Sequence, residues 1–119
     1  MKRIVLLQVA FVVMSCALFT PNKSSAEFYS VKDLKVGIRA YEKAERGETY
    51  SMAEWEHLAG YVTGVIDSTA HLYNLPGELK VKQAVAILIK YVNDHPEEWN
   101  SSASGVLQKA LSEAFPKPQ

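Results

Sequence analysis

Apolar residues recur at intervals of three and four in four separate segments of this chain, and this spacing constrains its fold more than any other feature. Side chains at such intervals lie on one face of an α-helix. No segment sustains the alternation of apolar and polar residues that is typical of a half-buried β-strand. The sequence therefore predicts an all-α protein that folds as a compact bundle of four helices.

Capping residues, glycines and prolines set the ends of these segments. Ser30 precedes the first segment and Gly47 follows it, as a start and a stop of a helix do. The second segment begins with the capping-box sequence of residues 51–54 and is broken near Pro76. Pro96 ends the third segment, because the residue before a proline is driven out of helical geometry. These signals predict helices over residues 31–46, 51–73, 80–94 and 102–115.

The first 26 residues have the pattern of an export signal. A basic start is followed by an apolar stretch and by small residues at 24–26, which a signal peptidase accepts. We therefore expect residues 1–26 to be a cleaved signal peptide and residues 27–119 to form one periplasmic domain without a membrane span. As an alternative, Cys16 could carry a lipid anchor, because residues 13–16 loosely resemble a lipobox.

The charge of the predicted domain argues against nucleic acid or an anionic membrane surface as its partner. The whole chain has 13 basic and 13 acidic residues. Removal of the signal peptide takes Lys2, Arg3 and Lys23 and no acidic residue, so the domain is acidic. Both partners require clustered positive charge. Cys16 is the only cysteine, so the domain has no disulfide, no thiolate nucleophile and no cysteine metal site.

Two glycines four residues apart lie inside the second predicted helix. Each costs about 1 kcal/mol relative to alanine, so we expect a compensating gain in packing. Gly60, Gly64, Asp67 and His71 share one ridge of the helix. The sequence predicts that another helix packs closely along this ridge, with Asp67 hydrogen-bonded by backbone N–H groups at a helix start. A ligand groove and a homodimer contact are the alternatives for the same ridge.

Five short motifs follow one another between residues 50 and 116. They are Gly60-Tyr61-x-x-Gly64-x-x-Asp67, an aromatic-x-Leu-Pro turn ending at Pro76, Gln83 in the next helix, Tyr91-Val92-Asn93-Asp94-His95-Pro96-Glu97, and Ala114-Phe115-Pro116. In this order and spacing they resemble the Rap/Tai family of type VI secretion amidase immunity proteins. The resemblance implies an exported, all-helical protein without enzymatic activity or cofactor. It also implies a partner, a peptidoglycan-cleaving amidase that the protein binds and blocks.

The chain departs from the family at two positions. Members often carry one cysteine in the turn before the Leu-Pro and another after the terminal Phe-Pro, and these look like a disulfide pair. The matching residues here are Asn74 and Lys117. Both cysteines are missing together, as loss of one bridge would produce, since a lone exported thiol is a liability. The resemblance therefore implies that Asn74 and Lys117 lie close in space.

The predicted partner-binding site is the loop over residues 94–101. It holds the acidic residues Asp94, Glu97 and Glu98 around Trp99. A projecting loop on a rigid helical scaffold loses little entropy on binding and can occupy an enzyme's active-site cleft. Trp99 is then the anchor, because tryptophan is enriched at interface hot spots. The alternative is that Trp99 folds back over the core, since tryptophan is buried on average.

Enzymatic readings have weaker support in the sequence. Glu54-x-x-His57 has the spacing of half a di-iron site, but no second copy exists, so we interpret His57 and His71 as surface or packing residues. No serine-hydrolase elbow, haem-attachment motif or phosphate loop is present. We expect no catalysis, metal or cofactor. A periplasmic stress or chaperone-type protein that binds many clients weakly is the competing function.

Overall fold

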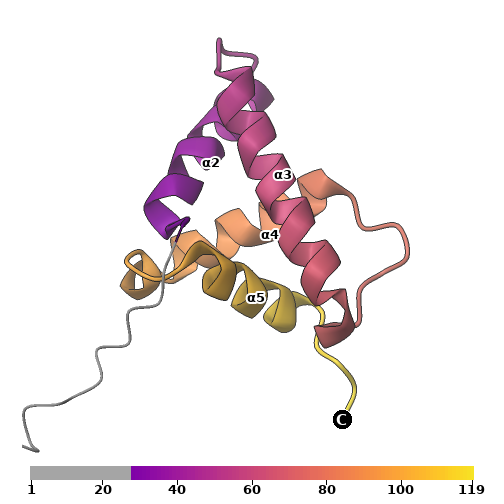
Figure 1. The fold of residues 1–119 in the computed structure, drawn as a ribbon. Coiled ribbons are helices and arrows are strands. Elements are labelled where there is room, and N and C mark those ends of the chain that lie inside the picture. Colours follow the sequence, from indigo (N-terminus) through magenta and orange to yellow (C-terminus); the bar gives the residue numbers. More distant parts are fainter. Residues whose placement is uncertain (1–27) are drawn as a thin grey trace, which may run out of the picture.

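Two pairs of antiparallel helices make up residues 28–119, the part of the chain that the computed structural model describes (Figure 1). The first pair is α2 (Val31–Glu45) with α3 (Met52–Thr69), and the second is α4 (Val81–Asp94) with α5 (Ala103–Ala114). Each helix packs mainly on its own partner, and α3 also contacts both helices of the second pair. The predicted all-α bundle of four helices is confirmed. The signal-peptide and Cys16 predictions lie outside the described residues.

Local hydrogen bonds fix both ends of α2. The Asp33 carboxylate accepts from the Ser30 backbone N–H at 2.8 Å and from the Ser30 hydroxyl at 2.7 Å, which holds the pKa of Asp33 below its usual value. At the other end Gly47 has a φ of 71°, a left-handed conformation that glycine adopts without strain. The Gly47 N–H donates to the Ala44 carbonyl, and the Glu48 N–H donates to the Lys43 carbonyl. This Schellman pattern confirms the predicted stop.

The second predicted helix is shorter than expected and continues as a 3₁₀ turn. Ser51 caps α3 by accepting a hydrogen bond from the Glu54 N–H at 3.3 Å. The α-helix ends at Thr69, and η1 (Ala70–Leu72) follows. Pro76 lies in the connection to α4, where its carbonyl accepts from the Leu79 N–H at 3.3 Å.

No helix within residues 28–119 is long and apolar enough to cross a membrane.

Leucines from every helix meet in the core. Leu34, Leu58, Leu88, Leu107 and Leu111 have no exposed surface, and each burial of this kind contributes about 2–3 kcal/mol. The helices contribute unequally. α4 and α5 each bury five residues, whereas α3, the longest helix, buries only two. Much of α3 therefore faces outward.

Gly37 of α2 lies in close contact with α3, although nothing in the sequence pattern singled it out. A Cβ at Gly37 would lie 2.5 Å from the Leu58 Cβ and 3.2 Å from the Glu54 carbonyl oxygen. At Gly60 and Gly64 a Cβ would meet nothing within 4 Å. The predicted helix contact along the glycine ridge of α3 is therefore wrong.

The rest of that ridge also faces outward. Asp67 and His71 are exposed, and within residues 28–119 the backbone N–H groups at helix starts donate to other side chains and not to Asp67. The orientation of α3 about its own axis explains this. Leu58 and Val62, on the opposite side of the helix, are buried in the core, so the ridge faces away from it. A homodimer through the exposed ridge stays a prediction.

Candidate protein-binding site

The loop between α4 and α5 is a series of tight turns. α4 ends at Asp94 because Pro96 follows, and Pro96 opens the 3₁₀ turn η2 (Pro96–Glu98). The backbone N–H groups of Glu98 and Ser101 then donate to carbonyls three residues earlier, at 3.0 and 2.9 Å. The backbone of this loop is thus hydrogen-bonded along most of its length, which limits its conformational freedom.

The exit of the loop is paired with the chain segment before α2. Ser30 and Ser102 form an antiparallel bridge. The Val31 N–H donates to the Ser101 carbonyl at 3.3 Å, and the Ala103 N–H to the Tyr29 carbonyl at 3.1 Å. Ser102 also caps α5 by accepting from the Gly105 N–H at 3.2 Å. The loop is therefore held at both ends by elements that belong to the core.

Trp99 attaches the loop to two helices. Its indole Nε1–H donates to the Val92 carbonyl of α4 at 2.8 Å, and the Lys35 ammonium of α2 lies 2.8 Å from the ring centroid. The side chain thus folds back onto the protein, yet 39% of its surface stays exposed. These two contacts show that Trp99 helps to hold the loop against α4 and α2. Its part in binding a partner stays a prediction.

Replacing Trp99 with alanine is expected to lower the free energy of unfolding by about 2 kcal/mol, because it removes one hydrogen bond and a cation–π contact. Denaturant unfolding of the wild type and the variant measures this change. The variant Trp99→Phe serves as the control, since it keeps an aromatic face for Lys35 and loses only the Nε1 hydrogen bond. A loss below about 0.5 kcal/mol for Trp99→Ala, within the range of ordinary surface substitutions, would contradict the attachment role.

Glu98 is directed inward, unlike the other predicted carboxylates. Its Oε1 accepts from the Lys109 ammonium of α5 at 2.6 Å, and the Glu98 side chain is 18% exposed. This hydrogen bond raises the pKa of Lys109. The second oxygen, Oε2, is buried without a hydrogen-bond partner within residues 28–119. Glu98 therefore joins the loop to α5, whereas Asp94 and Glu97 are exposed and available to another molecule.

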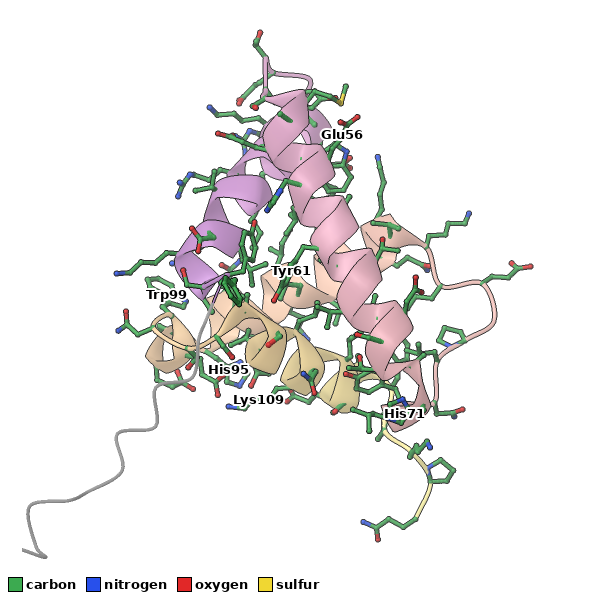
Figure 2. All side chains as sticks on the ribbon, viewed as in Figure 1. Glu56, Tyr61, His71, His95, Trp99 and Lys109 are labelled. Atoms are coloured by element: carbon green, nitrogen blue, oxygen red, sulfur yellow. The ribbon has the colours of Figure 1, made fainter. Side chains whose placement is uncertain are left out.

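The three labelled residues around this loop lie at one end of the molecule. Figure 2 shows Trp99, His95 and Lys109 grouped where α4 ends and α5 begins, with His71 at the far side of the fold. His95 was part of a motif in the sequence but received no role there. Its Nδ1 lies 2.9 Å from the Tyr91 carbonyl, and its ring stacks on that of Tyr91 with the centroids 3.9 Å apart. Only the i, i+4 spacing of these two residues could have indicated the contact.

Asn74 and Lys117, the two positions that the resemblance matches to the family's cysteines, lie in neighbouring segments. The Asn74 backbone N–H donates to the Phe115 carbonyl at 3.1 Å. Phe115 precedes Lys117 by two residues, so this hydrogen bond brings the segment after α5 against the turn that contains Asn74. The contact supports the proximity of Asn74 and Lys117 that the resemblance implies.

The histidines of α3 and η1 are on the surface. His57 packs its ring against Tyr29, with centroids 5.2 Å apart, and His71 is exposed. Glu54 and His57 are both exposed on α3. Between residues 28 and 119 no group of three or more histidine, cysteine, aspartate or glutamate side chains could hold a metal ion.

The described residues form a small helical scaffold with a hydrogen-bonded acidic loop between α4 and α5. The sequence model of the Rap1a immunity proteins matches residues 25–116. The chain therefore belongs to the Rap1a immunity protein family, a class of proteins that bind a cognate toxin and are not enzymes. This finding confirms the predicted family. No solved structure matches the chain.

Proposed function

We propose that this protein acts in the periplasm, where it binds a peptidoglycan amidase delivered by type VI secretion and occludes its active site. Membership of the immunity family supports the inhibitory role, and the pattern of residues 1–26 supports export. The observation that carries the proposal is the loop over residues 94–101, which is tied to three helices and exposes Asp94 and Glu97.

Rigidity is what suits this loop to inhibition. A loop that is ordered before it binds loses little conformational entropy on entering a cleft, so more of the contact energy appears as affinity. Its exposed carboxylates favour a cleft with a positively charged rim, and such charge complementarity speeds association and selects the partner. The family assignment favours one tight toxin partner over the many weak clients of a chaperone-type protein.

Co-expression in the periplasm of a host bacterium tests this function. Small amidases with a cysteine and histidine in the active site, encoded beside the gene, are exported with and without this chain. The expected result is lysis with the amidase alone and normal growth when both are present. The purified pair should bind with a dissociation constant in the nanomolar range, as tight protein inhibitors do.

A pair of charge-reversal variants checks the loop. Asp94→Lys with Glu97→Lys is expected to weaken amidase binding by about 100-fold, since each lost charge contact contributes on the order of 1–2 kcal/mol at an interface. Glu56→Lys with Glu78→Lys changes the net charge equally at exposed sites elsewhere and should bind like the wild type. Equal binding by both double variants would contradict the loop as the docking site, and growth arrest despite this chain would contradict the function.

A further inference from the structure

The outward face of α2 carries a row of basic side chains. Half of the basic residues that follow residue 26 lie in this helix or directly after it, namely Lys32, Lys35, Arg39, Lys43 and Arg46. At about 100° of rotation per residue, Lys32, Arg39 and Lys43 fall within about 40° of one another, opposite the fully buried Leu34. Figure 2 shows side chains that end in nitrogen projecting from α2 on the side away from α3. We refer to this row as the basic face of α2.

Most of the charge on the basic face is not neutralised within the fold. Arg46 pairs with Glu48 through two hydrogen bonds of 3.0 Å, and this pairing lowers the pKa of Glu48. Among residues 28–119, by contrast, Lys32, Arg39 and Lys43 form no salt bridge. All three are exposed. They are therefore available to another molecule.

The carboxylates of α2 lie away from this row. Asp33 accepts hydrogen bonds from Ser30 at the start of the helix. Glu45 pairs with Lys82 of α4 at 2.9 Å. Glu42 is half-buried at the edge of the basic face. The face thus keeps an excess of positive charge, although the domain as a whole is acidic.

A recess lies beside the basic face, between α2 and the turn that leads into α3. It encloses about 450 Å³ and is lined by two of the exposed cations and by three residues with hydroxyl groups: Arg39, Lys43, Thr49, Tyr50 and Ser51. The Ser51 hydroxyl accepts from the Glu54 N–H at 3.3 Å, so its own proton can be donated to a further acceptor. Glu54 is the one carboxylate that the described residues contribute to this lining. Positive charge and hydrogen-bond donors therefore predominate in the recess.

We propose that the basic face of α2 docks an acidic segment of the protein partner, with one aspartate or glutamate side chain of that segment in the recess. A carboxylate has acceptors and no donor, and the Arg39 guanidinium can bind it through two parallel hydrogen bonds. Lys43 and the hydroxyl groups supply further donors. The identity of the partner rests on the function proposed above, whereas the preference for an acidic segment rests on α2 and its recess alone.

An anionic membrane surface fits this face less well than a protein segment. Helices that lie on membranes insert an apolar face, and on the outward side of α2 the exposed large apolar residue is Val36 alone. The Lys35 ammonium stacks on Trp99, so the basic face adjoins the loop that exposes Asp94 and Glu97. These carboxylates repel a broad anionic surface, whereas a single acidic segment can follow the row of cations.

Two surfaces of opposite charge thus lie side by side. The partner must present an acidic segment next to a basic rim, and such a pattern fixes the orientation in which the two proteins dock. A partner with the reverse order would place like charges together, which disfavours it.

The preference for acidic segments can be tested without the toxin. N-acetyl-hexaglutamate amide is titrated into the isotope-labelled protein while backbone NMR signals of residues 32–51 are followed. We expect these signals to shift together, with a dissociation constant on the order of millimolar, because exposed ion pairs are individually weak. N-acetyl-hexaglutamine amide has the same length without the charge and should cause no shift at the same concentrations. Added salt should weaken the binding of the glutamate peptide.

Matched double variants locate the binding. Arg39→Gln with Lys43→Gln should weaken hexaglutamate binding about 5-fold, as loss of two exposed ion pairs predicts. Lys80→Gln with Lys117→Gln changes the net charge equally at exposed positions elsewhere and should bind like the wild type. Both double variants should keep the unfolding midpoint of the wild type, because all four side chains are on the surface.

Three results of these titrations would overturn the proposal: shifts confined to other surfaces, equal affinity for the two peptides, or equal weakening by the two double variants. Co-sedimentation with phosphatidylglycerol vesicles is the fourth test. The wild type should stay in solution, and sedimentation that is lost in the Arg39 and Lys43 double variant would assign the face to a membrane instead.

The outcomes for this surface and for the proposed function are separate. Protection of a host cell without hexaglutamate binding would reject the acidic docking segment and keep the function. Hexaglutamate binding at the basic face without protection against any amidase would reject the function and keep the surface.

Discussion

Replacing Gly37 with alanine is expected to lower the free energy of unfolding by about 2 kcal/mol, because overpacking of a helix contact costs about 1–3 kcal/mol. The added Cβ would lie 2.5 Å from the Leu58 Cβ, a separation that real Cβ atoms do not show. Neither group is the end of a flexible side chain, so α2 and α3 must move apart. The better helix propensity of alanine offsets only about 1 kcal/mol of this cost.

On the exposed ridge of α3, replacing glycine with alanine is expected to have the opposite effect on the free energy of unfolding. Gly60→Ala and Gly64→Ala add a methyl group into open space within a helix, so each should raise the free energy of unfolding by about 0.5–1 kcal/mol. Denaturant unfolding of the three variants, with unchanged slopes, gives the comparison. A stabilised Gly37→Ala, or a destabilised Gly60→Ala, would show that the face of α3 that packs on the core is the one first predicted from the sequence.

Helix ends could be predicted from the sequence because their hydrogen bonds join residues three to five positions apart. Ser30 with Asp33, and Gly47 with the carbonyls before it, are interactions of this kind. The spacing of apolar residues likewise predicted the helices that form the core. Both features depend on residues close together in the chain, so one sequence contains the information.

The glycine prediction was wrong for a different reason. A glycine costs the same propensity at Gly37 as at Gly60, so the local pattern cannot tell which one has a neighbouring helix. That choice depends on Leu58 and Val62, which rotate α3 so that Gly60 faces out, and on Gly37, which sits across from Leu58. The long-range fit between helices decided the outcome.

The contacts that hold the candidate loop in place also could not be predicted from local sequence patterns. The loop was predicted from the proline, the acidic residues and the tryptophan, all of which are neighbours in the chain. Lys35 stacks on Trp99 from another helix, and Lys109 pairs with Glu98 from a third, and no local pattern indicates either contact. Of the four residues predicted to meet a partner, Trp99 and Glu98 hold the loop, and Asp94 and Glu97 remain free to bind.

Under the proposed function, this division of roles separates the residues that stabilise the loop from those that recognise the partner. Residues that fix the loop contact α2, α4 and α5, so changes there alter both the fold and the site. Asp94 and Glu97 contact no other element through a hydrogen bond or salt bridge within residues 28–119, so their replacement should alter binding alone. A protein built in this way can change its partner through exposed side chains while its scaffold stays the same.

Introducing cysteines at positions 74 and 117 is expected to create a disulfide that raises the free energy of unfolding by about 2–4 kcal/mol. The bridge would close a loop of about 40 residues, and restricting a loop of that size in the unfolded chain gives a gain in this range. The Asn74 N–H already donates to the Phe115 carbonyl at 3.1 Å, so the two segments need no large movement. The backbone N–H is retained when the Asn74 side chain is replaced.

Thermal unfolding of the oxidised double variant, Asn74→Cys with Lys117→Cys, should show a midpoint about 15 °C above that of its reduced form, given about 4–8 °C per kcal/mol for a domain of this size. The reduced form is the control, because it has the same two substitutions without the bridge. A disulfide needs the two Cα atoms within about 7 Å of each other. If the double variant stays reduced under oxidising conditions, or oxidises without gaining stability, positions 74 and 117 are not the counterparts of the family's cysteine pair. A stabilised oxidised form would instead show that the domain has the geometry for a bridge between these two positions, as the resemblance to the family implies.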